Sequence, residues 1–216
     1  MKSLLRLCAA LALAGALAGC AAEEVWAPEE AVQRAAYSPG GSPTVTLVTM
    51  ISNSSGSGGH SALIIDGAQR VVFDPAGSWH HPQVPERNDV LYGMSPTLMG
   101  YYMDYHARET YHVVLQEVDV TPATAASLIA SVQSYGAVPQ AQCSLSISRV
   151  LSRTPGFESI GTSWYPVRTM NRFGELPGVR ESQIFDDDSD DNLELLQAQA
   201  RAAQTQAVAA EIAGGL

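Results

Sequence analysis

The feature that most limits how this chain can fold is a stretch at 59–77 that has the pattern of two short strands joined by a turn. His60 opens a short apolar run, Asp66-Gly67 is a typical hairpin turn pair, and β-branched residues fill the second run up to Asp74. This pattern predicts a β-hairpin. A polar residue stands at each outer end of it, His60 at the start and Asp74 at the finish.

The first twenty residues have the order of a secretion signal. A short basic start is followed by about a dozen apolar residues at 7–18, and the sequence LAGC closes the segment at Cys20. The run is shorter than the roughly 20 residues that a membrane-spanning helix needs. The segment resembles a bacterial lipoprotein signal peptide with its lipobox. The resemblance implies a signal at 1–19, cleavage before Cys20, and a bilayer anchor of acyl chains on Cys20.

The resemblance also implies a location. Ala21 follows Cys20 where an aspartate would favour retention in the inner membrane. The expected place is therefore the bacterial cell envelope, with the lipid anchor in the periplasmic face of the outer membrane. The sequence does not indicate an oligomeric state.

The charge of the chain argues against nucleic-acid partners. Twelve basic residues face 22 acidic ones. Removing Lys2 and Arg6 with the signal leaves 10 basic residues and no lysine, a net charge of −12. Such a surface repels nucleic acid and anionic lipid headgroups, so we expect no nucleic acid among the partners and attachment through the lipid alone.

One cysteine remains unassigned. Of the three cysteines, Cys8 leaves with the signal and Cys20 carries lipid, which leaves Cys143 alone in a compartment that favours disulfides. Cys143 stands at the predicted start of a helix, where free backbone N–H groups and the helix dipole favour a thiolate. Two interpretations are open: a reactive thiol or a small buried apolar residue.

The remaining patterns predict an α+β fold in which an antiparallel sheet packs against helices. The predicted strands and helices, in that order, are 44–51, 60–65, 70–74 and 110–120, then 96–108, 123–135 and 143–152. The segment 78–89 is expected to be irregular and 156–184 rich in loops. The glycines at 56–59 are either a linker or a backbone exposed for a ligand.

The ends of the chain differ from this core. Residues 20–43 contain several prolines and glycines and predict a flexible tether with one or two helical turns near 29–36. The core domain is expected at 44–185. An acidic run at 186–191 and an Ala- and Gln-rich helix or tail complete the chain to 216.

Neither a metal nor a cofactor is predicted. His80 and His81 are adjacent in a loop, a spacing that does not place both on one face of a helix or strand. The acidic run lacks the glycine and the final glutamate of an EF-hand loop. His106 and His112 are interpreted as structural residues.

Taken together, the GHSAL start of one strand, the FDP end of the next and the later CS helix start resemble the circularly permuted NlpC/P60 group of papain-like proteins, over about 44–153. The resemblance implies a permuted papain-like fold with Cys143 as nucleophile, His60 as base and Asp74 as the third residue. In the related lecithin-retinol acyltransferase group the third residue is a histidine. The nearest register here holds Phe73, one position before Asp74.

The residue types suit this chemistry on their own account. A thiolate attacks a carbonyl, an imidazole takes and returns the proton, and a carboxylate orients the imidazole. We therefore expect a peptidase, amidase or acyltransferase that works through an acyl-enzyme, with a peptide, peptidoglycan or lipid as substrate. The alternative is a noncatalytic envelope lipoprotein of binding or structural type, in which Cys143 is buried and inert.

Overall fold

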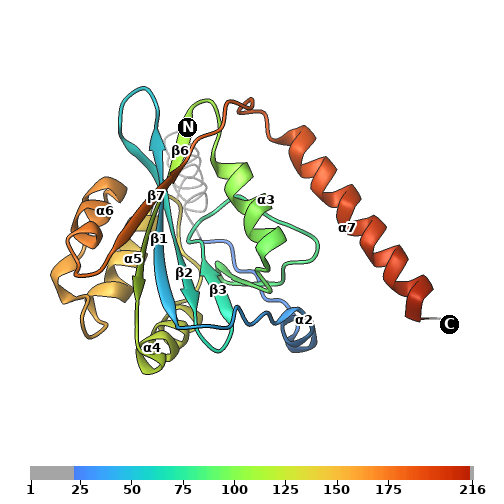
Figure 1. Ribbon diagram of the computed structural model, residues 1–216, viewed down its shortest axis with the longest axis horizontal. Helices are drawn as coiled ribbons and strands as arrows, with labels where there is room; N and C mark the ends of the chain where they lie inside the picture. The colour runs from blue at the N-terminus through green and yellow to red at the C-terminus, as the bar shows by residue number, and fades with distance from the viewer. Residues whose placement is uncertain (1–21, 215–216) are drawn as a thin grey trace, which may run out of the picture.

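In the computed structural model, which describes residues 22–214, strands β1–β7 form one antiparallel sheet in the order β4-β5-β3-β2-β1-β6-β7 (Figure 1). The strands are β1 Thr44–Ser52, β2 Gly58–Asp66, β3 Arg70–Phe73, β4 Glu86–Arg87, β5 Val90–Tyr92, β6 Tyr111–Asp119 and β7 Arg180–Ile184. The four strands predicted from the sequence form the centre of this sheet. The predicted α+β class with an antiparallel sheet is confirmed. The signal peptide and Cys20 lie outside the described residues.

Helices cover both faces of the sheet. The described helices are α2 Glu29–Ala35, α3 Pro96–His106, α4 Pro122–Gln133, α5 Cys143–Ser152, the 3₁₀ turn η1 Glu158–Ile160, α6 Pro166–Gly174 and α7 Leu193–Gly214. Ser95 and Thr121 cap α3 and α4, and each is followed by a proline in the first turn, as the sequence predicts for α4. In the described part of the chain, no helix has both the length and the apolar character needed to cross a membrane.

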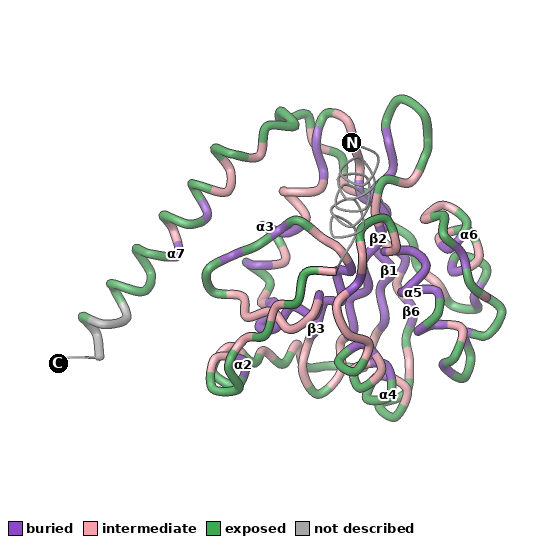
Figure 2. Tube along the Cα trace, turned by 180° about the vertical axis from the view of Figure 1, so that it is seen from behind, coloured by how far each residue is buried: buried purple, intermediate pink, exposed green. Residues whose placement is uncertain are grey.

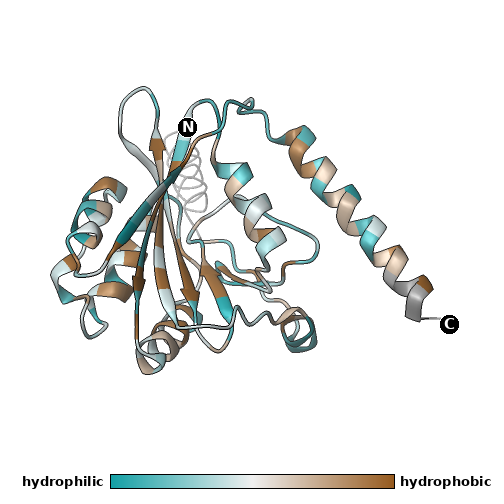
Figure 3. Cartoon of the chain, in the orientation of Figure 1, coloured by the Kyte–Doolittle hydropathy of each residue, from teal (hydrophilic) through white to brown (hydrophobic). Residues whose placement is uncertain are grey.

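Alternation along the central strands divides the buried side chains into two cores. Val45, Leu47, Leu63 and Phe73 face α4, α5 and α6. Their neighbours in sequence face α3 on the other side, where Tyr102 and Trp79 fill much of the volume. Figure 2 shows the buried segments along β1, β2 and β3, and Figure 3 shows the apolar residues on the same strands.

Three expectations about less regular segments need correction. The segment 156–184, expected to be loops, contains α6 and β7. The segment 78–89, expected to be irregular, contains β4. The predicted tether is packed in part, because Trp26 bridges to Arg87 in β4 and stacks on its guanidinium at 4.8 Å, while α2 buries Val32.

The acidic run folds back onto the loop between α3 and β6. Asp188 Oδ2 lies 3.2 Å from Arg108 Nη1, Asp190 accepts hydrogen bonds from Thr110, and Asn192 Nδ2 donates to the carbonyl of Tyr105 at 3.1 Å. Helix α7 then leaves the body of the protein, and its first half docks through Gln199 and Ala203, which are buried. The run is therefore part of the folded domain.

Candidate active site

His60 lies near the start of β2, directly after the Gly-rich loop. A Cβ atom at Gly59 would stand 2.6 Å from the Tyr111 ring, and one at Gly58 would stand 2.5 Å from Pro166. Real Cβ atoms do not come so close, so neighbouring groups would have to move for any larger residue. The two glycines that open β2 are thus needed for the close packing that positions His60.

Asp74 comes one residue after β3 and binds His60 directly. Its Oδ1 lies 2.6 Å from His60 Nε2, and its side chain is almost fully buried. The hairpin register pairs Leu63 with Phe73, so alternation directs Phe73 into the core under α4 and α5 and leaves His60 and Asp74 together on the other face. The position after Phe73 is therefore the one that can reach the imidazole.

The loop after Asp74 wraps around its carboxylate. The N–H of Gly77 donates to the carbonyl of Asp74 at 3.0 Å, and a Cβ at Gly77 would collide with the Asp74 carboxylate. Ala76 adopts a left-handed backbone conformation at φ 56°. A tight turn with a glycine at its end is thus what allows the carboxylate to sit beside His60.

Cys143 is the first residue of α5, as predicted. Ala141, two residues earlier, has a left-handed backbone at φ 62°, and Gln142 precedes the helix without a side-chain cap. The helix therefore begins with free backbone N–H groups. The N–H of Ser144 in this first turn and the N–H of Ser61 in β2 interact with the Cys143 sulfur and favour its charged form.

The three predicted residues meet at one pocket of about 250 Å³. Cys143 and His60 line it directly, and Asp74 lies behind His60. The other lining residues are Gly59, Pro75, Ala76, Gly77, Ser78, His106, Gln140 and Ala141. Cys143 is the free cysteine of the described residues, is 8 % exposed, and lines this pocket.

The electrostatics of the group favour an ion pair between thiolate and imidazolium. Burial acts to raise the pKa of Cys143, but the hydrogen bond and charge of His60 outweigh it, and the pKa is lowered. Burial likewise opposes the charged form of His60, yet Asp74 and Cys143 raise its pKa well above the ordinary value. The pKa of Asp74 is lowered by His60 despite burial. Since Nε2 is bound to Asp74, Nδ1 is the ring nitrogen left for the thiol.

His106, interpreted from the sequence as structural, is the second histidine of the site. Its ring stacks on His60 with centroids 6.1 Å apart and planes 10° from parallel. Its Nδ1 lies 2.8 Å from the carbonyl of Tyr102 and donates to it, because a carbonyl only accepts. Burial and the charge of His60 lower the pKa of His106 to about 4, so the ring is neutral near pH 7. The sequence gives no signal that would place this histidine, alone on its helix, beside His60.

Asp89 ties together the two chain segments that hold the site. Its Oδ1 accepts from the N–H of Ala76 at 2.9 Å, and its Oδ2 accepts from the N–H of Val138 at 2.7 Å. Its own carbonyl accepts from the N–H of Asp74 at 2.8 Å. Ala76 lies two residues after Asp74, and Val138 lies five residues before Cys143. Asp89 thus bridges the Asp74 loop and the segment that leads to Cys143.

Among the described residues, one group of carboxylates lies close enough together to bind a single metal ion: Asp104, Asp186 and Asp188. Arg108 already lies against it, with Nη2 3.4 Å from Asp104 and Nη1 3.2 Å from Asp188. A guanidinium therefore supplies positive charge at this position. We do not assign a metal to the group.

Comparison with protein-family models, curated proteins and solved structures finds no match for this chain. The resemblance to the permuted NlpC/P60 group thus stays a prediction. The interpretation of the site depends on its own geometry.

The ion pair predicts an unusual pH dependence for alkylation. In the folded protein, iodoacetamide should modify Cys143 at a lower pH than a free thiol requires, because His60 lowers the pKa of Cys143. In His60→Ala, the pH dependence of the rate should be that of a free thiol with a pKa of about 8.5. His80→Ala, which removes an exposed histidine, should behave like the parent. Mass spectrometry of the labelled peptide gives the rates. Labelling only after denaturation, or no effect of His60→Ala, would contradict the pair.

The Asp89 bridge predicts a coupled loss of stability and reactivity. Asp89→Asn places an N–H₂ group against one of the two backbone N–H donors, which should lower the free energy of unfolding by about 1–3 kcal/mol and slow alkylation of Cys143 several-fold. Asp187→Asn, an exposed change of equal charge, is the control. Denaturant unfolding and the alkylation assay measure both effects. Unchanged alkylation in a destabilised variant would limit Asp89 to a role in the fold.

The pH dependence of stability gives a second readout for the same variant. Burial raises the pKa of Asp89 from its ordinary 3.8 to about 6, against the two amide hydrogen bonds. The folded state therefore binds more protons than the unfolded state between these values, and the Asp89 contribution to stability falls as the pH rises through them. Asp89→Asn should lack this slope.

Proposed function

We propose that this protein is a cysteine-dependent hydrolase or acyltransferase that acts on an amide or ester through a covalent acyl-enzyme. The observation that carries the proposal is the 2.6 Å contact between His60 Nε2 and Asp74 Oδ1 in a pocket that also exposes Cys143. A thiolate, a base and an orienting carboxylate are the groups that this reaction class needs.

The proposed reaction has two steps. The Cys143 thiolate attacks the carbonyl carbon and forms a C–S bond, while backbone N–H groups at the start of α5 bind the oxyanion. The His60 imidazolium then protonates the leaving nitrogen or oxygen as its bond to carbon breaks. In the second step, water or another nucleophile loses a proton to His60 and attacks the thioester, which releases the acid or transfer product and restores the thiolate.

The order of the groups along the chain supports a circularly permuted papain-like fold of the NlpC/P60 type. The histidine strand comes first, the acid follows the next strand, and the cysteine helix comes last. Helix α5 packs against the central strand β2, which places the thiol beside the histidine. In the proposed division, 44–185 forms the catalytic unit, and the acidic run at 186–191 packs against it.

The alternative is a noncatalytic envelope protein in which Cys143 is inert. Its low exposure of 8 % is the observation in favour. The neighbourhood favours the enzyme, because an inert buried thiol gains nothing from a buried His–Asp pair. Burying two ionisable groups carries a desolvation cost that packing alone does not require.

Formation of an acyl-enzyme tests the proposal. With p-nitrophenyl acetate, the parent should release p-nitrophenolate in a burst and gain one acetyl group on Cys143. Cys143→Ala should show no burst. His60→Ala should slow acylation by about 10²–10⁴-fold, as for loss of a general acid–base group. The acylation rate of Asp74→Asn should lie between those of the parent and His60→Ala, because the loss of the carboxylate charge lowers the pKa of His60. Acetylation of a residue other than Cys143, or an active Cys143→Ala variant, would refute the reaction.

For the setting, we propose a bacterial cell-envelope lipoprotein, anchored by acylated Cys20 in the periplasmic face of the outer membrane. The support is the order of basic, apolar and LAGC segments at the start of the chain. A peptide, peptidoglycan or lipid of that compartment is the proposed substrate class. The strongly negative mature chain gives no reason to include nucleic acid.

Attachment through Cys20 has its own test. Cys20→Ala should abolish incorporation of a fatty-acid analogue and leave the precursor with its signal uncleaved, since the lipoprotein peptidase requires the lipidated cysteine. Cys143→Ala is the matched control and should be labelled like the parent. Gel fluorescence of membrane fractions measures the labelling. Equal labelling of Cys20→Ala would overturn the anchor.

A further inference from the structure

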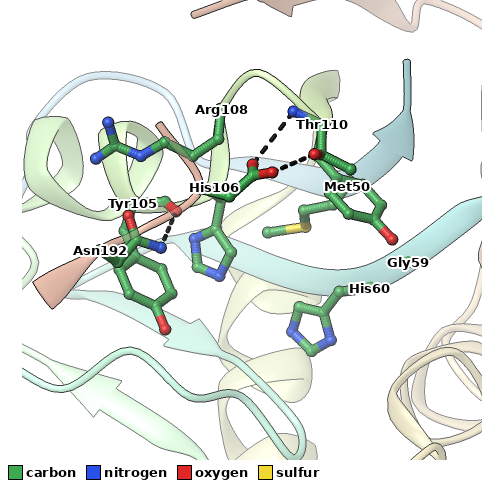
Figure 4. Close-up of a pocket in the computed structure, with 10 residues that line it drawn as sticks. Met50, Gly59, His60, Tyr105, His106, Arg108, Thr110 and Asn192 are labelled. Carbon is green, nitrogen blue, oxygen red and sulfur yellow. Dashed lines mark hydrogen bonds between the residues drawn. The ribbon is translucent and has the colours of Figure 1, made fainter. Parts of the chain in front are cut away.

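A second pocket, of about 460 Å³, adjoins the candidate active site on the far side of His60 (Figure 4). It shares Gly59, His60 and His106 with the pocket that holds Cys143, but Cys143 does not line it. The remaining lining residues are Met50, Tyr105, Arg108, Thr110, Tyr111, Asp190 and Asn192. The two imidazoles thus form the boundary between the two pockets.

The position of the histidine assigns a role to this second pocket. In the proposed reaction His60 protonates the leaving atom, so that atom must lie at the imidazole while the carbonyl carbon lies at the thiolate. The part of the substrate attached to the leaving atom therefore extends past His60. The space available there is the larger pocket.

Three residues of the wall, His106, Asn192 and Asp190, present hydrogen-bond acceptors to this pocket. His106 uses its Nδ1–H on the Tyr102 carbonyl, which leaves Nε2 of the neutral ring as a lone-pair acceptor. Asn192 uses its Nδ2 on the Tyr105 carbonyl, and its Oδ1 is buried without a hydrogen-bond partner. Asp190 accepts from the N–H and hydroxyl of Thr110.

The positive charges at the pocket are already matched. Arg108 lies between Asp104 and Asp188, and although its Nε and Nη2 make no hydrogen bond, Figure 4 shows its guanidinium turned away from the two imidazoles. The charge of His60 is offset by Asp74. Within residues 22–214 no ion pair involves Asp190. A carboxylate with only neutral donors thus remains in the wall.

We propose that the larger pocket binds a leaving group that carries a protonated amino group. This inference rests on the proposed function and names the substrate class of the same site. Two lone-pair acceptors, a carboxylate without a cationic partner and the aromatic rings of Tyr105 and Tyr111 in the lining match an ammonium, which has three donors and a positive charge. A carboxylate or phosphate beside His106 and Asn192 would meet two atoms that cannot donate and the charge of Asp190, while the nearest guanidinium, Arg108, is paired with Asp104 and Asp188.

The same pocket must receive the attacking group in the reverse direction, which makes the inference testable on the acyl-enzyme. An amine that occupies it attacks the Cys143 thioester, a C–N bond forms, the C–S bond breaks, and the amine proton passes to His60. The products are an amide and the free thiolate, without any oxidant or further reactant. The acyl group can be as simple as acetyl.

The experiment uses the full mature chain, acetylated by p-nitrophenyl acetate, and three acceptors of similar length. These are 1,3-diaminopropane, 3-amino-1-propanol and β-alanine, which present an ammonium, a hydroxyl and a carboxylate. For each amine, the rate of acetylation by the acetyl-enzyme is divided by the rate at which a free acetyl thioester acetylates the same amine. This ratio removes the difference in intrinsic reactivity between the amines. The normalised rate should be highest for the diamine, lower for the amino alcohol and lowest for the amino acid. The rate with the diamine should saturate as its concentration rises.

Two variants assign the preference to the pocket. Asp190→Asn should reduce the ratio of diamine to amino alcohol about tenfold, the lower end of the range for loss of a charge-assisted hydrogen bond. Asp187→Asn, in the same acidic run but outside the pocket, should leave the ratio unchanged. Equal normalised rates for the three acceptors, or an equal loss in both variants, would overturn the inference while acetylation of Cys143 stands. Failure to acetylate Cys143 would overturn the proposed function and the inference with it.

Discussion

The buried contact between His60 and Asp74 is the interaction on which the rest of the site depends. The His60 side chain is 19 % exposed and that of Asp74 only 3 %. Removing either charge from water costs several kcal/mol, and only a close partner of opposite charge offsets this. The β2–β3 register is therefore constrained, because a shift of one residue would move Asp74 to the opposite face and leave the imidazole without its carboxylate.

Holding the thiol at this pair requires constraints from outside the hairpin. Helix α5 lies on the face of the sheet opposite to α3, whereas the His60 ring stacks on His106 at the end of α3. The thiol and the imidazole thus approach each other around the end of β2. The left-handed residues Ala76 and Ala141, both in the pocket wall, provide the sharp changes of direction that such an approach needs. Asp89 joins the segments that contain them, so the backbone around the site forms one hydrogen-bonded unit.

The sequence predicts the centre of the fold well and its edges poorly, for a physical reason. The central strands bury side chains on both faces, and apolar runs such as those in β1 and β2 indicate strands directly. Edge strand β7 has four exposed polar residues and no apolar pattern, and α6 is a short helix that buries only Thr169 and Phe173. For the site, the sequence indicates Cys143 as a cysteine at a helix start and His60 as a histidine at a strand start. His106 and Asp89 act through contacts between segments distant in sequence, which no local pattern reports.

The acidic run shows how a domain boundary drawn from composition can separate residues that work together. A block of like charges is typical of a solvated or disordered segment, and the predicted core ends just before it. In the structure the run meets Arg108, the one arginine on the loop between α3 and β6, and this pairing brings Asp190 and Asn192 to the wall of the larger pocket. The charges repel one another, and the ion pair with Arg108 offsets this repulsion, while hydrogen bonds from Thr110 and from Asn192 hold the segment against the loop. The wall of the larger pocket is therefore supported by a buried guanidinium, 5 % exposed, which lies outside both the hairpin and the cysteine helix.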